Sequence, residues 1–233
     1  MTENKVILAG IDGCRNGWLV IRGVFLPDSK VFIKEDVLIL TNVKEVFPLS
    51  ADIYAFDMPI GLLENYVPGG RTCDRMARKL LGPRRASIFS PPPRKAFLAN
   101  SYQELKKLGL KLSLQSFNLL PKIKELDEYL RLYKPLNVYE THPELVFWSE
   151  AQKTIPSKHS TEGFAKRKML LEKSHLFRSL SFNLSQIRAS LRKDLLDAYA
   201  CLLAAKKIYL KEARVIPEEA EKDTFGLKMQ IWF

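Results

Sequence analysis

The chain has 233 residues, of which 46% are hydrophobic and 27% charged, and its 37 Lys and Arg against 26 Asp and Glu give a formal net charge of +11. This length suits one large α/β domain or a core with an insertion, and the balanced composition excludes intrinsic disorder. No apolar run reaches the roughly 18 to 20 residues of a membrane-spanning helix, and the start of the chain lacks a signal-peptide pattern, which predicts a cytoplasmic protein without a membrane partner. Cys14, Cys73 and Cys201 have no spacing typical of a disulfide framework or a zinc site.

Three β-strands are predicted at the start of the chain, over residues 6–12, 17–25 and 30–40. Each stretch is rich in β-branched and aromatic residues. Turn-forming residues separate them, namely Asp12-Gly13, Asn16-Gly17 and Pro27-Asp28-Ser29. These turns favour an antiparallel meander.

A fourth strand is predicted at residues 51–59, after a short helix that Thr41 can cap and that ends before Pro48. The apolar run from Ile53 to Phe56 suits a buried central strand, and Asp57 marks its end. Because a helical crossover precedes it, this strand can lie parallel to the first.

Residues 62–134 contain no clear strand and are predicted to form helices at 72–81, 101–109 and 112–133. Ser101 and Glu104 have the spacing of a capping box, and the proline triplet at 91–93 requires an extended loop. We therefore expect a single domain over residues 1–233 with a helical insertion or cap at about 62–135, between the fourth and fifth strands.

The rest of the chain is predicted to add a strand at residues 137–145, which Pro143 stops, and a helix at 161–174. The clearest helical pattern runs over residues 186–210 and has basic residues at its end. Residues 228–233 predict a short strand or a docked tail.

Acidic residues fall where predicted strands end or where the last helix begins: Asp12, Asp57, Glu140, Asp194 and Asp197. The carboxyl ends of parallel strands are where α/β sheets build their sites, and two acids three residues apart share one face of a helix. Mg²⁺ and Mn²⁺ prefer carboxylate oxygens, and such ions activate water and stabilise the leaving oxygen of a phosphodiester. The pattern therefore predicts a site for divalent metal ions.

Each acid taken alone also has an ordinary structural interpretation. Asp12 fits a tight turn before Gly13, Asp57 can cap the segment that follows it, and Asp194 can pair with Lys193 or Arg192. The metal-site interpretation requires that several of these acids lie close together in the folded protein.

Glu140, His142 and Glu144 alternate along the predicted fifth strand, which would place them on one face. His142 is conceivable as a metal ligand, but Mg²⁺ sites seldom use imidazole. We favour a supporting hydrogen-bonding role for His142 and Glu144.

Arginines are concentrated in the glycine- and proline-rich stretch 69–95, and five of them are candidate substrate-binding residues: Arg71, Arg78, Arg84, Arg85 and Arg94. The guanidinium group matches phosphate oxygens, which favours nucleic acid as a partner, as does the net positive charge. A solvated basic face, or arginines that neutralise Asp74 and nearby acids, fits the stretch equally well. No Walker or dinucleotide-binding glycine motif occurs.

Five motifs together resemble a known family; in order they are GIDGCRNGW, AFDMPIGL, GGRTCDRMAR with SIFSPPPRKAF, YETHPELVF and DLLDAYACLLAA. They are similar to those of an uncharacterised family of predicted nucleases with a ribonuclease-H-like fold, a domain of unknown function, over nearly the whole chain. More distantly, the first strand with its acid and the last helix look like those of Holliday-junction resolvases.

The resemblance implies a mixed five-stranded sheet, its first three strands antiparallel, flanked by helices. It also implies that Asp12, Asp57, Glu140 and Asp197 are the catalytic and metal-ligand candidates, with Asp194 beside them, and Mg²⁺ or Mn²⁺ as the cofactor. The leading hypothesis is therefore a metal-dependent nuclease acting on RNA or DNA. A non-catalytic nucleic-acid-binding protein is the first alternative, and an actin-like ATP-using phosphotransferase the second.

Overall fold

The computed structural model describes residues 4–173 and 177–233, and the chain divides into two compact units. The first unit holds the described residues of Met1–Met58 and Asn137–Arg214, together with Trp232–Phe233. The second unit holds Pro59–Leu136 and Val215–Ile231. The predicted insertion at about 62–135 thus belongs to a compact unit that also includes a segment near the C-terminus.

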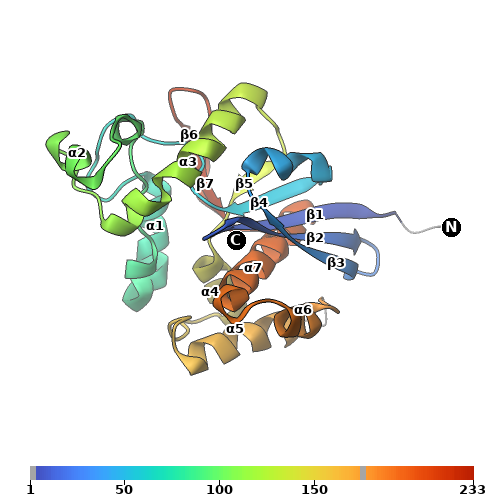
Figure 1. Ribbon diagram of the computed structural model, residues 1–233. Helices are drawn as coiled ribbons and strands as arrows, with labels where there is room; N and C mark the ends of the chain where they lie inside the picture. Colours follow the sequence, from blue (N-terminus) through green and yellow to red (C-terminus); the bar gives the residue numbers. More distant parts are fainter. Residues whose placement is uncertain (1–3, 174–176) are drawn as a thin grey trace. The chain divides into compact units, whose positions relative to one another are not determined.

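A mixed sheet of five strands forms the centre of the first unit (Figure 1). The strands are β1 (Val6–Cys14), β2 (Gly17–Leu26), β3 (Val31–Leu40), β4 (Ile53–Asp57) and β5 (Val138–Glu140), in the order β3-β2-β1-β4-β5. The first three are antiparallel, whereas β4 runs parallel to β1 and β5 parallel to β4. The predicted meander and the parallel fourth strand are confirmed.

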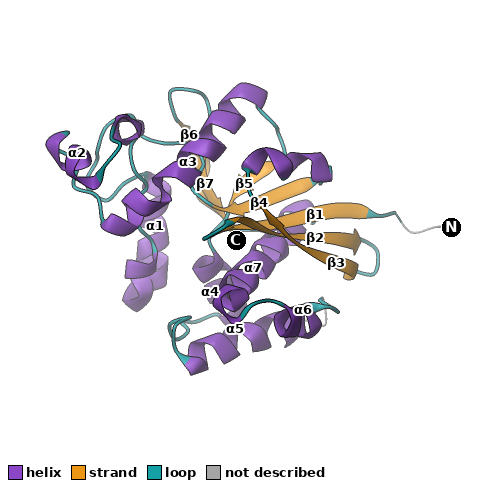
Figure 2. Ribbon diagram, viewed as in Figure 1, coloured by secondary structure: helices purple, strands orange, loops and turns teal. Residues whose placement is uncertain are grey.

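Helices cover one face of this sheet (Figure 2). They are α4 (Pro143–Ala151), α5 (Thr161–Lys173), α6 (Leu180–Gln186) and α7 (Arg192–Tyr209), with the 3-10 turn η5 (Ala189–Leu191). Helix α7 packs directly on β1, β2 and β4, and α4 and α5 pack on α7. The side chains of α7 are therefore the ones that meet the central strands.

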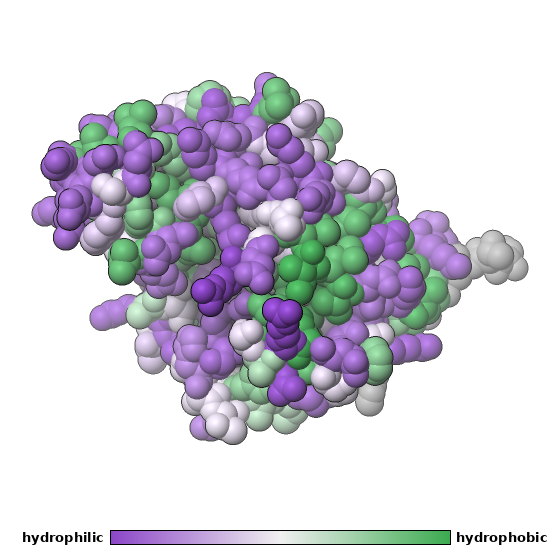
Figure 3. All heavy atoms as spheres, viewed as in Figure 1, coloured by the Kyte–Doolittle hydropathy of each residue, from purple (hydrophilic) through white to green (hydrophobic). Residues whose placement is uncertain are grey.

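Aromatic residues and two short 3-10 turns, η1 (Val43–Glu45) and η2 (Phe47–Leu49), pack on the other face. Phe56 of β4 makes an edge contact with Trp18 at 5.8 Å between ring centroids and stacks with Phe47 at 6.0 Å. Figure 3 shows an apolar area over the strands, bordered by polar residues. The sheet thus has a core on both sides.

Helix α7 approaches strand β1 very closely at Gly10. A Cβ atom on Gly10 would lie 2.2 Å from the Ala198 carbonyl oxygen and 2.2 Å from the Leu202 main-chain nitrogen. These are backbone atoms of the helix, so the contact requires glycine. Side chains two residues apart on a strand face the same way, and Asp12 consequently faces α7.

The second unit contains the helices predicted for the insertion and a two-stranded sheet. Its elements are α1 (Thr72–Leu81), η3 (Gly82–Ser87), η4 (Arg94–Leu98), α2 (Tyr102–Lys107), α3 (Leu114–Tyr133), β6 (Val215–Lys222) and β7 (Lys228–Trp232), the last residue of β7 belonging to the first unit. The predicted cap at Ser101 is confirmed, since its side chain accepts from the Glu104 N–H. Strand β6 is not predicted by its sequence, which has few β-forming residues.

Several predicted boundaries are wrong. The predicted strand 137–145 ends at Glu140, because Pro143 occupies the first turn of α4 and His142 caps that helix. The predicted helix 186–210 begins only at Arg192, after the end of α6 and the turn η5. Asn42, and not Thr41, caps η1. Helix α5 confirms the prediction for residues 161–173, and Ser174 lies outside the described residues.

Within the described part of the chain, no helix is long and apolar enough to cross a membrane. Cys14, Cys73 and Cys201 are buried free thiols.

The Gly10 contact predicts a specific loss of stability. Gly10→Ala should lower the free energy of unfolding by about 2 kcal/mol or more, because the new methyl group meets helix backbone. Gly23→Ala is the matched control on β2: its Cβ would meet the Phe32 ring at 2.6 Å, and a ring can shift. Urea unfolding should give the larger loss for Gly10→Ala, and equal losses would contradict the close helix contact.

Candidate functional site

The register of two central strands brings Asp12 and Asp57 side by side. They are direct partners in the parallel pairing of β1 with β4, and their side chains are hydrogen-bonded to each other. Asp12 is only 7% exposed. A hydrogen bond between two carboxyl groups needs a proton on one of them, so this pair is already disposed to share a cation or a proton.

Helix α7 places Asp197 against this pair. Asp197 is 2% exposed, and it interacts electrostatically with both Asp12 and Asp57. Asp194, three residues earlier in the first turn, is half-buried and interacts with Asp12 and Asp197. The positive end of the helix dipole favours acids at this position. We call Asp12, Asp57 and Asp197 the acidic cluster.

Burial and like charge perturb the acids of this cluster. Burial, and then the charges of Asp57 and Asp197, raise the pKa of Asp12 well above its usual range. Burial and the charge of Asp197 raise the pKa of Asp57 to about 7. The pKa of Asp194 is raised for the same two reasons, burial and Asp197. A cation placed among carboxylates held together in this way stabilises them, because it offsets their repulsion.

Lys158 is a member of the site that sequence reasoning missed. It comes from the connection between α4 and α5, and its Nζ donates to Asp197 Oδ2. Burial acts to lower the pKa of this ammonium, but the charges of Asp197, Asp12 and Asp57 outweigh it and the pKa is raised. The sequence carries no signal for this contact, because Lys158 and Asp197 lie 39 residues apart and Lys158 is one of many lysines.

The strand register sets Glu140 apart from Asp12 and Asp57. It pairs with Phe56, the residue before Asp57. Paired residues on neighbouring strands share a face and successive residues alternate, so Glu140 lies on the face opposite Asp57 and Asp12. The predicted alignment of Glu140 with His142 and Glu144 on one strand face is also wrong, because His142 and Glu144 belong to the start of α4.

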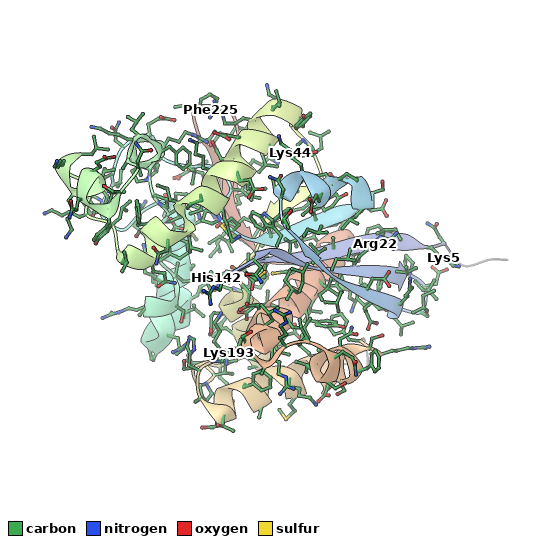
Figure 4. The ribbon with its side chains drawn as sticks, viewed as in Figure 1. Lys5, Arg22, Lys44, His142, Lys193 and Phe225 are labelled. Carbon is green, nitrogen blue, oxygen red and sulfur yellow. The ribbon has the colours of Figure 1, made fainter. Side chains whose placement is uncertain are left out.

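Glu144 interacts electrostatically with the acidic cluster. Its charge contributes to the raised pKa of Asp57, after burial and the charge of Asp197. Its two carboxylate oxygens accept from Arg167 Nη2 at 2.7 and 2.9 Å. His142 Nδ1 accepts from the Glu144 N–H at 3.2 Å, at the N-terminus of α4 (Figure 4). Glu144 and His142 are thus held in fixed positions, which is compatible with the supporting role predicted for them.

The predicted phosphate-binding arginines all lie in the second unit, and the structure gives two of them structural partners. Arg71 is buried and bonded to Asp74 and to the carbonyls of Ile60 and Gly61. Arg94 is buried and bonded to Asp127 and Asp223. Both guanidinium groups are buried and used for internal contacts, so neither is open to a substrate.

The other three predicted arginines are more accessible. Arg85 is exposed, and Arg84 is half-buried. Arg78 is half-buried and donates to the carbonyls of Ile88 and Gly69. Their role as substrate-binding residues stays a prediction.

The donor set of the acidic cluster fits a hard divalent cation, because it consists of carboxylate oxygens. Across residues 4–173 and 177–233, however, no three carboxylate, imidazole or thiol side chains are arranged to hold a metal ion. The donor atoms are thus suitable for a metal ion, but their arrangement is not. Lys158 contributes to this arrangement, since its ammonium is bonded to an Asp197 oxygen. Metal binding would require that contact to rearrange.

These features define an α/β protein whose mixed five-stranded sheet and last long helix enclose a cluster of carboxylates with one ammonium. Residues 10–222 match the family described as Protein of unknown function (DUF429), and the chain belongs to that family. No curated protein and no solved structure matches the chain.

The raised pKa of Asp57 predicts how stability depends on pH. The ordinary value is 3.8 and the folded value about 7, so the folded protein keeps a proton that the unfolded chain releases. Stability present below about pH 4 is therefore lost as the pH rises through about 7. In EDTA, urea unfolding should show Asp57→Asn less dependent on pH than the natural protein, and more stable by roughly 1–3 kcal/mol at about pH 8.

Asp28→Asn is the control for this measurement, because Asp28 is exposed in the same unit. It should follow the natural protein at every pH. If Asp57→Asn does the same, the acids do not repel one another in the folded protein.

Proposed function

We propose that the protein is a metal-dependent hydrolase that cleaves phosphodiester bonds of nucleic acids, on a fold of the ribonuclease-H-like type. The single observation that carries the proposal is the acidic cluster: Asp12, Asp57 and Asp197 come from two neighbouring strands and a helix and meet in a buried position. Groups with perturbed pKa values gather at functional sites because catalysis requires unusual charge arrangements.

Asp12, Asp57 and Asp197 would hold Mg²⁺ or Mn²⁺, with Asp194 at the more open edge. A bound ion supplies Lewis acidity and lowers the pKa of a water molecule. The chain's own residues fix the positions of the donors: β1 and β4 hold two acids in register, and α7 holds the third through its contact at Gly10. Such pre-positioned donors are what efficient metal catalysis requires.

Two further features support the fold and the substrate. The strand order, with an antiparallel meander followed by parallel strands and a helix carrying acids on one face, agrees with the expectation from the family resemblance. The net charge of +11 and the accessible side chain of Arg85 favour a polyanionic substrate through release of counterions. Both features are weaker support than the cluster itself.

A second candidate function is non-catalytic binding of nucleic acid. The observation that favours it is the Lys158–Asp197 ion pair, which gives the cluster a cation without any metal. In this case the acids and Lys158 would be a buried structural group, and the basic surface alone would bind the partner.

The proposed activity predicts a sharp effect of Asp12→Asn. With Mg²⁺ or Mn²⁺ and a panel of RNA, DNA, hybrid and branched substrates, the natural protein should cleave at least one, and Asp12→Asn should reduce the rate by about 100-fold or more. Asp28→Asn should leave the rate unchanged.

Binding measured on the same panel separates the two candidates. No cleavage by the natural protein, combined with salt-dependent binding that Asp12→Asn leaves intact, would overturn the hydrolase and support the binding protein. Isothermal titration with Mn²⁺ should detect an ion whose binding requires Asp12.

A further inference from the structure

We propose that Phe225 and Arg131, with Lys134 beside them, form a binding site for one unpaired nucleotide of single-stranded nucleic acid. The Phe225 ring would stack on the base, and the two cations would bind neighbouring phosphates. All three residues belong to the second unit, whereas the acidic cluster belongs to the first. The inference rests on the proposed nucleic-acid partner, and it specifies the form in which that partner is bound.

Phe225 is an exposed aromatic residue on a rigid turn. It lies between β6 and β7 (Figure 4), and it is 46% exposed. Asp223 Oδ1 accepts from the N–H groups of Phe225 and Leu227, both at 2.9 Å. The Gly226 N–H donates to the Asp223 carbonyl at 3.0 Å. A ring that is already fixed loses little conformational entropy when a base stacks on it.

A buried ion pair anchors this turn. Asp223 Oδ2 accepts from Arg94 Nη2 at 2.7 Å, and the Asp223 side chain is fully buried. The guanidinium carbon of Arg94 lies 4.6 Å from the centre of the Phe225 ring. Phe225 therefore has a structural role as a cover for Arg94. Any large apolar side chain would serve that role, whereas stacking on a base requires an aromatic ring.

Arg131 contacts the same ring and retains hydrogen-bonding capacity. Its guanidinium carbon is 3.7 Å from the centre of the Phe225 ring. Arg131 Nη1 donates to Asp127 Oδ2 at 3.4 Å, whereas Arg94 donates to Asp127 at 2.5 Å. Arg131 Nε has no hydrogen-bond partner among the described residues, and the side chain is 35% exposed. A guanidinium group that is oriented by a ring and only weakly paired suits a phosphate oxygen.

A cavity of about 380 Å³ adjoins these two residues. Its walls are formed by Glu128, Arg131, Leu132, Lys134 and Phe225. This volume is near the lower end of the range for small-molecule sites, which suits a single base and its sugar. The walls contain two cations and one acid, and the acid, Glu128, lies 3.9 Å from Lys124. The cavity therefore combines an aromatic surface with a positive charge that favours phosphate.

The chemistry of the cavity favours a single strand over a duplex. In a duplex the bases stack on one another, so their flat faces are not open to a protein side chain. An unpaired base can stack on Phe225 while its phosphates lie near Arg131 and Lys134. The net charge of +11 also favours a polyanion over an apolar protein surface as the partner.

Binding to single strands tests the proposal. Fluorescein-labelled oligo-dT and oligo-U are titrated with the full chain in EDTA, which prevents metal-dependent cleavage, and fluorescence anisotropy is recorded. Phe225→Leu keeps an apolar cover over Arg94 but should lower the affinity for at least one of these strands by about fivefold or more. Its affinity for a duplex of the same length should not change. Phe182→Leu replaces an exposed phenylalanine of the first unit and should bind like the natural protein.

Phe225→Trp gives a spectroscopic readout that a purely structural role would not move. It should bind single strands at least as tightly as the natural protein, and stacking of a base on the new indole should quench its fluorescence. A side chain that only covers Arg94 would show no quenching when oligo-dT or oligo-U is added.

The contribution of Arg131 is measured by the salt dependence of binding. Arg131→Gln should reduce the slope of the logarithm of affinity against the logarithm of salt concentration by about 0.7, because one phosphate contact is lost. Lys44→Gln removes an equal charge from an exposed position of the first unit and should leave the slope unchanged.

The outcomes separate this site from the proposed hydrolase. Unchanged affinity for both strands in Phe225→Leu, without quenching in Phe225→Trp, would overturn the site while leaving the hydrolase in place. Loss of affinity in Phe225→Leu, in a protein that cleaves no substrate, would support the site and overturn the hydrolase. No binding of any nucleic acid would overturn both. Self-association that requires Phe225, without binding of single strands, would assign this surface to a second copy of the chain and overturn the nucleotide site.

Discussion

Asp12, Asp57 and Asp197 are buried together in the first unit, and their like charges repel one another. Asp12 and Asp57 are brought together by strand register, and Asp197 is pressed against them by a helix that touches the strand backbone at Gly10. The three acids cannot move apart to reduce this repulsion, because main-chain packing fixes the position of each. The fold therefore holds the acids together against their charge, and Lys158 is the cation that offsets part of it.

Buried acids in the second unit form ion pairs with arginines and have a structural role. Asp74 is paired with Arg71 at 2.7 Å, and Asp127 with Arg94 at 2.5 Å. Asp127 also pairs with Arg131, and Arg94 pairs with Asp223 and Glu64 as well, so two guanidinium groups serve three acids there. Asp12, Asp57 and Asp197 instead interact with the one ammonium of Lys158. A group of acids that is left with too little positive charge can accept more, which is the property of a cation-binding site and not of a stabilising ion-pair network.

Much of the fold follows from local sequence. The turns around Gly13, Gly17 and Pro27 predict the meander. The acids of the site can also be predicted, because they fall at the ends of predicted strands and on a predicted helix. The start of α4 is harder to predict, because Pro143 both ends a strand and begins a helix, and a strand pattern continues through it. Strand β6 is missed for a simpler reason: its sequence VIPEEAEK is mostly polar, and pairing with β7 decides its structure.

The site was predictable only in part, and the reasons are physical. Glu140 follows the same rule as Asp57, an acid at the end of a strand, but register decides which face it takes, and one residue of register reverses the face. Lys158 and Arg167 belong to the site through contacts between segments far apart in the chain. Local patterns contain no information on such pairs, so the positive charge of the cluster could be located only in the structure.

We propose that Asp12, Asp57 and Asp197 form a site for a divalent ion beside Lys158. Anomalous scattering from crystals of the full chain soaked with Mn²⁺ would locate such an ion. We predict one strong peak among the three carboxylates, next to the Lys158 ammonium, and its disappearance in Asp12→Asn crystals soaked in the same way. A cluster that stays free of manganese, with Lys158 still bound to Asp197, would show that these acids are not a metal site.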